Sequence, residues 1–317
     1  MSMILLETLE IPSNLRHGAV TIGNFDGVHR GHAKLIERIT SYSKSHHTPS
    51  VVFTFHPHPA CILHPERAPQ PLTWINRKAK LLGRLGVDAV IACPTTPTIL
   101  TWSAEEFFHY ILCEKLAATH VVEGTNFFFG HHRSGNTQTL STLCAIHHMT
   151  CELVQPVITS GEIVSSSRIR QLITDGMIVE ANQLLTCPYR IRGMVIHGLA
   201  RGRTLGFPTA NLEAIDTLLP RHAIYAGRVF YNDCFYPAAI HIGPNRTFRE
   251  TIPKVEIHIL DFHNSIYGKL LKVDFLAFLR EIISFPSQEA LIQQVKKDIL
   301  AVREIFTSKK YNISETP

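Results

Sequence analysis

The spacing of the apolar segments divides the chain into two parts with different patterns. From residue 18 to about residue 185, short β-rich runs such as "AVTIG", "SVVFTF", "AVIAC" and "THVVEG" alternate with segments of helical period, the first over about 32–43. This alternation is typical of a parallel sheet with crossover helices. After "LLTCPYRIRG" the runs follow one another closely, as in "GMVIHG", "FYPAAIHIG" and "KVEIHILDF", which indicates a small antiparallel barrel or sandwich.

The change of pattern predicts two domains, residues 1–185 and 186–317. A chain of 317 residues is about twice the length of a typical domain, which agrees with this division. Within the first part, Ser103 and Glu106 form a capping-box pattern that predicts a helix start. At the end of the second part, a helix is expected from Ser287 to about Phe306, with one apolar stripe of Leu291, Ile292, Val295, Ile299 and Val302.

Composition restricts the partners that such a chain can have. No apolar run reaches the roughly 18 residues of a membrane span, and the start "MSMILLETLEIPSN" has no basic region of a signal peptide, so we expect a cytoplasmic protein without a membrane partner. A net charge of +5 is too small for a dedicated nucleic-acid binder but suits small anionic ligands such as nucleotides. The seven cysteines include no Cys-x-x-Cys pair, so we expect neither disulfides nor a cysteine-based zinc site. The sequence does not indicate an oligomeric state.

The stretch "TIGNFDGVHRGH", residues 21–32, joins the first predicted strand to the first predicted helix through a glycine loop. Such a loop lies at the carboxyl edge of a parallel sheet, where ligands bind, and the free amides of the following helix attract phosphate. His29 and His32 are about one helical turn apart and can contact the same triphosphate. The alternative is a zinc site formed with the histidines of "FHPHP", residues 55–59, but Asp26 is the only nearby carboxylate that such a site could recruit.

The glycine loop is followed, in order, by "FTFHPHP", "GTNFFFGHHRSGN", "VSSSRIR", "HGLARGRTLGFPTANL", "VEIHILDF" and "IYGKLLKV". Together these motifs resemble the bacterial bifunctional riboflavin kinase and FMN adenylyltransferase (FAD synthetase) family over nearly the entire chain. The resemblance implies an α/β nucleotidyltransferase-like, Rossmann-like parallel-sheet domain followed by a small antiparallel β-barrel riboflavin kinase domain with a C-terminal helix. It also implies an enzyme that phosphorylates riboflavin with ATP to FMN and then adenylylates FMN with ATP to FAD, releasing pyrophosphate, with Mg²⁺ as cofactor.

For adenylyl transfer, the resemblance assigns His29 and His32 to the ATP phosphates as catalytic residues. It places further nucleotide and flavin contacts at Gly23, Asn24, Phe25, Asp26, Gly27, Asn126, Arg133, Ser167 and Arg170. From the residues alone, a helix cap with a solvated basic face is the more common explanation of the serines in "SSSRIR", and the glycine loop upstream favours phosphate ligation instead. Phe127 and Phe129 are expected in the core rather than against the flavin.

For the kinase, "KVEIHILDF" places Val255, Ile257 and Ile259 on one strand face and Glu256 with His258 on the other. Solvation is the ordinary explanation of such a glutamate, and the resemblance instead makes Glu256 the proton acceptor for the riboflavin hydroxyl. "GLARGRT" lacks the length and the lysine of a P-loop, and by resemblance it is a flap over ATP. The implied ligands are Thr209 and Asn211 for Mg²⁺, which an extended chain points to one side, and Gly202, Arg203, Gly206 and Pro208 for the nucleotide.

Some positions depart from the pattern of the family. Asn126 stands where the family usually has an aspartate, Phe128 replaces an arginine, and "IGPNRTF" carries Pro244 and Arg246 where the family more often has another residue and a proline. Two alternatives therefore stay open: a chain that retains only one activity, with the kinase the more secure, or a non-catalytic flavin-binding regulatory protein. The presence of the complete set of implied catalytic and metal-binding residues argues against the second alternative.

Overall fold

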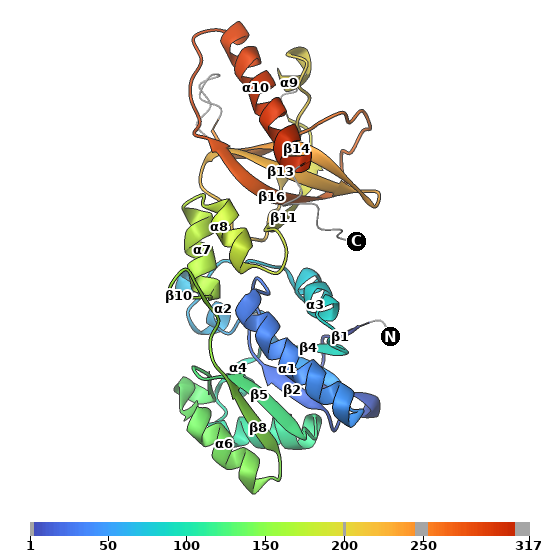
Figure 1. The fold of residues 1–317 in the computed structure, drawn as a ribbon, viewed down its shortest axis with the longest axis vertical. Helices are drawn as coiled ribbons and strands as arrows, with labels where there is room; N and C mark the ends of the chain where they lie inside the picture. Colours follow the sequence, from blue (N-terminus) through green and yellow to red (C-terminus); the bar gives the residue numbers. More distant parts are fainter. Residues whose placement is uncertain (1–2, 199–200, 245–252, 308–317) are drawn as a thin grey trace. The chain divides into compact units, whose positions relative to one another are not determined.

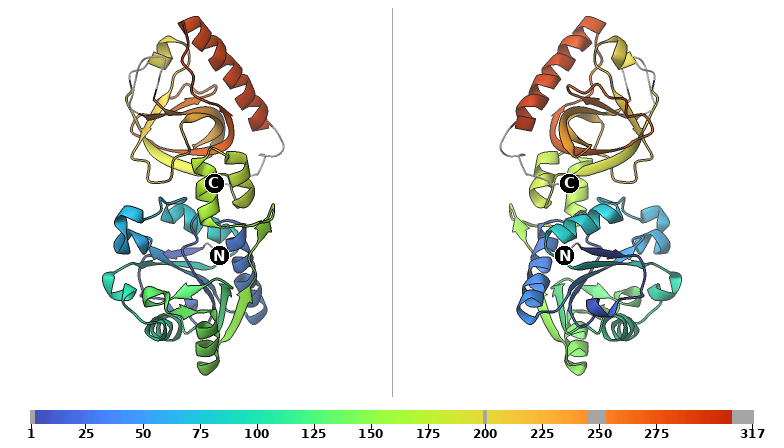
Figure 2. Two further views of the ribbon diagram at one scale, coloured as in Figure 1. Left: turned by 90° about the vertical axis from the view of Figure 1, so that its left-hand side faces the viewer. Right: turned by 90° about the vertical axis from the view of Figure 1, so that its right-hand side faces the viewer.

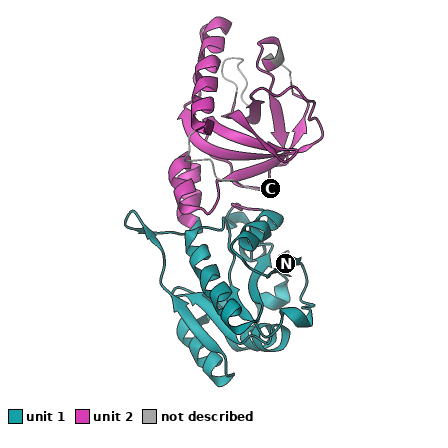
Figure 3. Cartoon of the chain, turned by 45° about the vertical axis from the view of Figure 1, so that its right-hand side comes forward, with its two compact units in different colours: residues 1–69, 74–166 teal, residues 70–73, 167–317 magenta. Residues whose placement is uncertain are grey.

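A computed structural model describes residues 3–198, 201–244 and 253–307 of the chain (Figure 1). The chain divides into two compact units, coloured separately in Figure 3. The first, here called the sheet unit, comprises residues 1–69 and 74–166, and the second, the barrel unit, comprises residues 70–73 and 167–317. No helix in the described ranges combines the length and the apolar character that crossing a membrane requires.

The sheet unit is built on six parallel strands in the order β1-β4-β3-β2-β5-β8. Val51, Val52 and Phe53 in the middle of the sheet are fully buried, as is usual for a parallel sheet covered on both faces. The strands are β1 (Ile4–Leu6), β2 (Ala19–Ile22), β3 (Ser50–His56), β4 (Ala89–Pro94), β5 (His120–Gly124) and β8 (Thr150–Val154). The predicted parallel α/β domain is thereby confirmed.

Helices connect these strands, and short elements fill the loops. The helices are α1 (Arg30–His46), α2 (Ala60–Leu63), α3 (Ile75–Arg84), α4 (Pro97–Leu100), α5 (Ala104–Phe107), a π-helix (Phe108–Lys115) and α6 (Thr137–Ile146). Two hairpins pair β6 (Phe128–Phe129) with β7 (Gly135–Asn136) and β9 (Ile158–Thr159) with β10 (Glu162–Ile163), and 3-10 turns occupy Ser13–Leu15, Pro65–Arg67 and His131–Arg133.

Four local details differ from the sequence prediction. The edge strand β1 was not predicted, and the strand expected over 151–157 is β8, which ends at Val154. The first helix begins at Arg30, before the predicted start near His32, because His29 caps it. The helix expected over 103–116 does begin with the Ser103–Glu106 capping box, in which Glu106 N–H donates to Ser103 Oγ at 3.1 Å. After one α-helical turn it continues as a π-helix.

A buried carboxyl group holds the end of β2 at the point where strand order changes direction. β3 and β4 follow β2 on one side of the sheet, and β5 and β8 lie on the other, so the crevice between β2 and β5 is the topological switch point. β2 and β5 are paired only at their first two residues, after which Ile22 N–H donates to Glu123 Oε1 at 2.5 Å. Burial raises the pKa of Glu123 well above its ordinary value. The side chain therefore replaces a main-chain partner for the residue that leads into the glycine loop.

The barrel unit is a closed six-stranded antiparallel barrel in the order β11-β12-β15-β14-β13-β16, visible as a ring in Figure 2. Its strands are β11 (Arg190–Ile196), β12 (Ala210–Glu213), β13 (Ala223–Tyr231), β14 (Cys234–Gly243), β15 (Lys254–Ile259) and β16 (Leu270–Arg280). Asn232 and Asp233 both adopt positive φ, at 46° and 60°, and form the predicted tight turn between β13 and β14. The β-barrel prediction is confirmed, with β12 as an additional strand.

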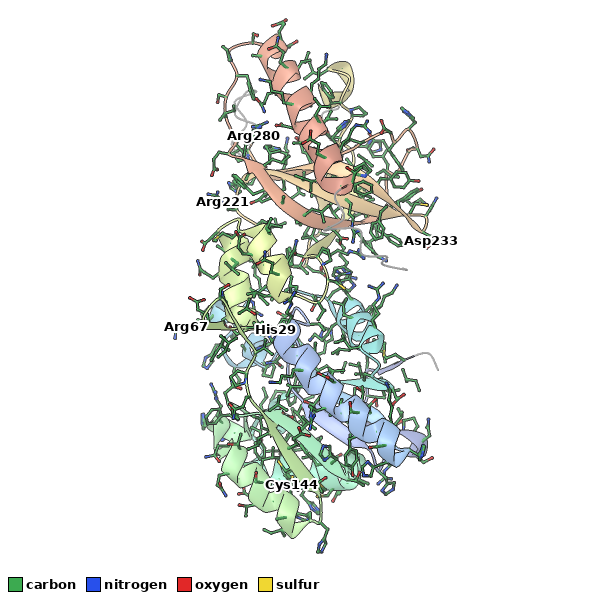
Figure 4. All side chains as sticks on the ribbon, viewed as in Figure 1. His29, Arg67, Cys144, Arg221, Asp233 and Arg280 are labelled. Carbon is green, nitrogen blue, oxygen red and sulfur yellow. The ribbon has the colours of Figure 1, made fainter. Side chains whose placement is uncertain are left out.

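Ion pairs fix the barrel interior and its closing helix. Asp274 is fully buried and accepts hydrogen bonds from Arg190 Nη2 and Arg228 Nε, each at 2.8 Å. The C-terminal helix α10 (Gln288–Thr307) packs on β13 and β14, and its Asp298 accepts a hydrogen bond from Arg280 Nη2 at 2.7 Å. Arg280, at the end of β16, is labelled in Figure 4. The predicted C-terminal helix is thus present and joined to the barrel by a partly buried charge pair.

The helices α7 (Ser166–Thr174) and α8 (Ile178–Leu184), with the short α9 (Arg201–Thr204), complete the barrel unit. Asn182 of α8 donates to the Phe275 carbonyl at 2.9 Å and accepts from Tyr189 N–H at 2.8 Å, which holds α8 against β16. The division of the compact units, between Ser166 and Ser167, therefore precedes the predicted domain boundary at residue 185. The helical pattern of this segment did not show which unit it packs against.

The buried Glu123 gives a testable pH dependence. The native state keeps a proton on Glu123 that the unfolded chain loses above the ordinary carboxyl pKa. The contribution of Glu123 to the free energy of unfolding should therefore fall by about 1.4 kcal/mol per pH unit, from that pKa up to the raised native pKa. Glu123→Gln keeps the acceptor for Ile22 but has no titrating proton at this position. The free energy of unfolding of the variant, relative to that of the wild type, should therefore increase with pH. Urea unfolding at several pH values, followed by the fluorescence of Trp74 and Trp102 in the sheet unit, measures this difference. If the free energies of unfolding of the wild type and the variant changed with pH in parallel, Glu123 would be ionised in the folded chain.

Two candidate active sites

The glycine loop after β2 has an unusual backbone. Phe25, Gly27 and Val28 adopt positive φ values of 46°, 83° and 42°. A β-branched valine is a clear outlier in this region, and such residues cost on the order of 1–3 kcal/mol each. Phe25 and Val28 have 1% and 0% of their surface exposed, so burial of their side chains offsets this cost. The loop is therefore held in a strained shape by its own apolar anchors.

His29 and His32 cap the start of α1 reciprocally. His29 is the N-cap residue, and its Nδ1 accepts a hydrogen bond from His32 N–H at 3.2 Å. His32 Nδ1 in turn accepts from His29 N–H at 3.3 Å. The two rings stack with their centroids 3.5 Å apart and their planes at 15°. The sequence prediction that both histidines lie side by side at the loop-to-helix junction is confirmed.

The electrostatics of the pair keep both rings neutral at neutral pH. Burial lowers the pKa of His29 to about 4, although Asp26 opposes this shift. Burial also lowers the pKa of His32 well below its ordinary value, and the charges of His29 and Lys78 lower it further. Because each Nδ1 accepts a backbone N–H, the single proton of each neutral ring lies on Nε2. The site thus presents two fixed N–H donors beside the free amides of a helix N-terminus.

Lys78 is a site residue that the sequence reasoning missed. It lies on α3 with 7% of its surface exposed, and burial lowers its pKa while Asp26 raises it. The same lysine lowers the pKa of His32, so Lys78, Asp26 and His32 form one electrostatic group at the glycine loop. One feature of the sequence could have indicated its burial: this lysine lies on the apolar face of an amphipathic helix, near the buried Ala79 and Leu82.

The loop is also held by the first residue of α7. Ser166 Oγ donates to the Asp26 carbonyl at 2.8 Å, and both residues belong to the sheet unit. The predicted ligands Ser167 and Arg170 belong to the barrel unit, where Ser167 is exposed and Arg170 Nε donates to the Gln70 carbonyl at 2.9 Å. The structure therefore gives Ser166 a role in positioning the loop, while Ser167 and Arg170 stay predictions as phosphate ligands.

Three of the four histidines considered as zinc ligands, His29, His32 and His58, have side-chain hydrogen-bond partners. Asn24 Nδ2 lies 2.9 Å from His58 Nε2, and His58 Nδ1 accepts from Ala60 N–H at 3.1 Å. Both Nδ1 atoms of the stacked pair are used by the helix start. Within the described part of the chain, a cluster of metal-ligand type occurs elsewhere, at His109, Cys113 and His147. The nitrogens of the loop histidines thus favour hydrogen bonding over zinc ligation.

Two of the positions that depart from the family pattern lie at the surface, in the segment after β5. Asn126 is exposed, and 46% of the surface of Phe128 is exposed. The guanidinium carbon of Arg133 lies 4.5 Å from the Phe128 ring centroid, so this arginine stacks on the replacing phenylalanine. Phe129 is buried and Phe127 packs against the same core, which confirms their prediction as core residues.

The second site lies on one face of neighbouring barrel strands. In register across three strands, Asn211 of β12 lies opposite Glu256 of β15, which lies opposite His241 of β14. His241 Nδ1 is 3.5 Å from Glu256 Oε2, and about a fifth of each side chain is exposed. Val255, Ile257 and Ile259 point into the core as predicted. The structure thus brings the implied base and one implied metal ligand together, with His241 as an additional neighbour.

A second set of contacts holds the "GFPTAN" segment beside this row. His258, two residues after Glu256, lies with its Nδ1 2.8 Å from the Pro208 carbonyl, to which it donates. Phe207 N–H donates to the Gly202 carbonyl at 2.7 Å, and a Cβ on Gly202 would lie 2.4 Å from the Phe207 carbonyl oxygen. Gly206 takes the positive φ of 86° that the turn requires. Thr209 follows directly and is partly buried. The side chain of Arg203, and Arg246 with its loop, lie outside the described residues.

Comparison with known proteins matches both parts of the chain to families. A family model described as FAD synthetase matches residues 11–168, and one described as riboflavin kinase matches residues 185–306. A protein of Listeria monocytogenes named bifunctional riboflavin kinase/FMN adenylyltransferase is 34% identical over 290 residues, which cover 90% of this chain and 92% of that protein. The chain belongs to the bifunctional riboflavin kinase/FMN adenylyltransferase family. It is therefore an ATP-using enzyme of FMN and FAD synthesis.

Other members of this family are similarly related to the chain. The protein of the same name from Pseudomonas fluorescens is 35% identical over 286 residues, covering 90% of this chain and 92% of that protein. The one from Escherichia coli K12 is 31% identical over 288 residues, covering 90% and 92%. A crystal structure described as a macrolide-efflux protein from Streptococcus pneumoniae has a TM-score of 0.85 and 30% identity, covering 96% of this chain and 99% of that one. That likeness extends over both the parallel-sheet and barrel parts of the fold.

Lys78 gives a direct test of the first site. Lys78→Met keeps an unbranched apolar stem but removes the charge, so FAD formation from FMN and ATP should fall by roughly 10², the scale of losing one charge-stabilising group. FMN formation from riboflavin should not change. Lys80→Met is the matched control, because Lys80 is exposed on the same helix. Wild-type rates of FAD formation in Lys78→Met would remove the lysine from the site.

Proposed function

We propose that adenylyl transfer takes place at the glycine loop and that His29 and His32 act there as neutral hydrogen-bond donors. The reciprocal cap carries this proposal, because it fixes both rings and leaves Nε2–H as the free donor of each. The phosphate of FMN is already ionised near neutral pH, so the reaction needs no general base. Stabilisation of charge on the phosphates therefore supplies most of the catalysis.

In this proposal each group of the loop has a separate task. Free amides at the start of α1 and the strained backbone around Gly27 receive the ATP phosphates. The imidazole Nε2–H groups and the Lys78 ammonium stabilise the charge that grows on the α-phosphate and on the leaving pyrophosphate. The bond between the α- and β-phosphates breaks as the FMN phosphate oxygen attacks, which gives FAD and pyrophosphate. Asn126, Arg133, Ser167 and Arg170 are proposed as further nucleotide and flavin contacts.

We propose that Glu256 is the proton acceptor of the kinase. The terminal hydroxyl of the riboflavin side chain is a weak nucleophile, and a carboxylate within hydrogen-bond reach removes its proton as it attacks the γ-phosphate of ATP. Glu256 is partly buried on the open face of β15, and His241 lies beside it at 3.5 Å and steadies the carboxylate. Gly202, Arg203, Gly206 and Pro208 belong to the proposed flap over the nucleotide.

The residues beside Glu256 fit a magnesium ion. Thr209 and Asn211 offer side-chain oxygens on the same extended segment, and Asn211 faces Glu256 across the β12–β15 pair. Hard oxygen donors in small number are what Mg²⁺ uses together with water and substrate phosphates. Thr209 and Asn211 would hold the ion, which neutralises phosphate charge when bound. His258 contributes by holding Pro208, the residue before Thr209.

The proposed substrates are riboflavin, FMN and ATP, and the proposed location is the cytoplasm, where these nucleotides and a reducing environment occur. All seven cysteines carry free thiols in the structure, which agrees with this location. The functional division of the chain is proposed to follow the sequence boundary, with adenylyl transfer in residues 1–185 and the kinase in residues 186–317. The replacements Asn126 and Phe128 make loss of the first activity the specific alternative.

Two substitutions separate the activities. His32→Gln keeps a helix-capping side chain at this position but removes the imidazole Nε2–H, so FAD formation should fall by roughly 10² or more while FMN formation persists. Glu256→Gln preserves shape but removes the proton acceptor, so kinase turnover should fall by roughly 10² to 10⁴ while FAD formation from supplied FMN persists. Glu213→Gln is the control, because Glu213 is exposed on β12.

Separate chromatographic assays of FMN and FAD across a magnesium titration distinguish the alternatives. A loss in Glu256→Gln that high Mg²⁺ restores would make Glu256 a metal ligand, and normal FMN synthesis at every magnesium level would end its assignment as base. An equal loss of both activities in a well-folded His32→Gln would show that the two sites are misassigned. Wild-type chain that makes FMN but no FAD would support the single-activity alternative.

A further inference from the structure

A cluster of metal-ligand side chains lies in the sheet unit away from the glycine loop. One ligand atom each of His109, Cys113 and His147 lies within 4.8 Å of the other two. His109 and His147 are exposed and Cys113 is partly buried, so an ion could reach the cluster from solvent. The adenylyl-transfer chemistry described above uses none of these residues.

The topology places this cluster at the opposite edge of the sheet from the glycine loop. α6 runs back from the carboxyl end of β5 to the amino end of β8, and His147 follows α6 three residues before β8 begins at Thr150. The π-helix that carries His109 and Cys113 likewise ends shortly before β5 begins. In Figure 4, Cys144, three residues before His147, and His29 lie at opposite ends of the sheet unit.

The backbone at the cluster is of a rare type. His109 and Cys113 lie on the π-helix Phe108–Lys115, in which Leu116 N–H donates to the Ile111 carbonyl at 3.0 Å, five residues back. π-helical segments are rare and frequently occur at functional sites. In this helix, as in an α-helix, residues four apart lie on the same side. The spacing His-x-x-x-Cys therefore presents an imidazole and a thiol together.

The cluster also has the neighbours that hold metal ligands in place. Glu114 Oε1 lies 3.1 Å from His109 Nε2, and a carboxylate partner of this kind orients a ligating histidine and raises its basicity. The ring of His147 lies against the fully buried Phe108, with ring centroids 5.5 Å apart. The backbone N–H of His147 donates to the Leu143 carbonyl at 3.1 Å. Both sides of the cluster are thus anchored in the fold before any ion binds.

We propose that His109, Cys113 and His147 form a binding site for a divalent transition metal of the zinc type. Two imidazoles and one thiolate are the donor set that zinc favours, whereas Mg²⁺ and Ca²⁺ prefer oxygen ligands. Water completes the tetrahedral coordination, since both histidines are exposed. The bound ion joins the π-helix to the end of α6 and therefore stabilises the sheet unit without entering either active site. The expectation of no cysteine-based zinc site considered only Cys-x-x-Cys pairs, and this cluster has a different spacing.

Cobalt tests the proposal because its spectrum identifies a thiolate ligand. Metal-free full-length chain, kept reduced with a phosphine, is titrated with Co²⁺ and followed by absorption. The wild type should develop a near-ultraviolet thiolate-to-cobalt band together with visible tetrahedral bands, and Zn²⁺ should abolish both. Cys113→Ser should lose the thiolate band, and His147→Asn should weaken Co²⁺ binding at least about tenfold. The matched controls Cys61→Ser and His148→Asn should bind as the wild type does, because Cys61 is an exposed cysteine outside the cluster and His148 is an exposed histidine next to it.

Stability and activity provide the second readout. Zn²⁺ at a hundredfold excess over its Kd should raise the melting temperature of the sheet unit by about 5 °C or more in the wild type and in both controls, and not in His147→Asn. FAD formation by metal-free His147→Asn should equal that of the wild type. Absence of a thiolate band in the wild type, or its survival in Cys113→Ser, would overturn the site. If Cys113→Ser does not fold, the exposed His147→Asn decides alone: unchanged Co²⁺ binding would equally overturn it.

Discussion

The reciprocal hydrogen bonds between His29 and His32 are the interaction on which the first site depends. Each imidazole uses its Nδ1 to satisfy a backbone N–H at the start of α1, so the same two bonds fix the helix start, the ring positions and the tautomers. A site of this kind does not depend on protonated histidines, whose charge would vary around neutral pH. The positive charge comes instead from Lys78 and from the helix N-terminus. The strained backbone of Phe25 and Val28 and the Glu123 carboxyl group beneath β2 serve to hold that arrangement at the switch point.

The two units solve two different chemical problems. Adenylyl transfer starts from an ionised phosphate, so a loop that concentrates hydrogen-bond donors is sufficient. Phosphorylation of a hydroxyl requires a proton acceptor, and the barrel provides a carboxylate on a rigid strand, with Asn211 and His241 in register on either side. The fully buried Asp274, with Arg190 and Arg228, helps to fix the strands around this row. In both sites the functional side chains project from backbone that is positioned by buried neighbours rather than by the surface.

Features set by local pattern could be predicted from the sequence, whereas those set by distant contacts could not. Strand alternation predicted that Glu256 lies on the strand face away from the core, and the glycine loop predicted that His29 and His32 lie together. Both features depend on residues close in sequence. Lys78 and Glu123 lie far in sequence from the loop that they support, so local pattern can suggest that Lys78 is buried but not that either residue lies beside the loop. His109 and Cys113 are four residues apart on one helix, but the approach of His147 depends on a contact distant in sequence, so the cluster could not be predicted from local pattern. The helices before residue 185 follow the α/β pattern but belong to the same compact unit as the barrel, a grouping that depends on contacts distant in sequence.

The protonation state of the histidine pair is the most direct test of the central claim. Two-bond nitrogen–proton NMR correlations of histidine-labelled chain, assigned with His29→Gln and His32→Gln, report both the tautomer and the titration of each ring. At pH 7 both imidazoles should be neutral with the proton on Nε2, and His29 should begin to protonate only as the pH approaches about 4. His32 should also stay neutral well below its ordinary pKa. Protons on Nδ1, or titration of either ring near pH 6.5, would contradict the proposed neutral donor pair.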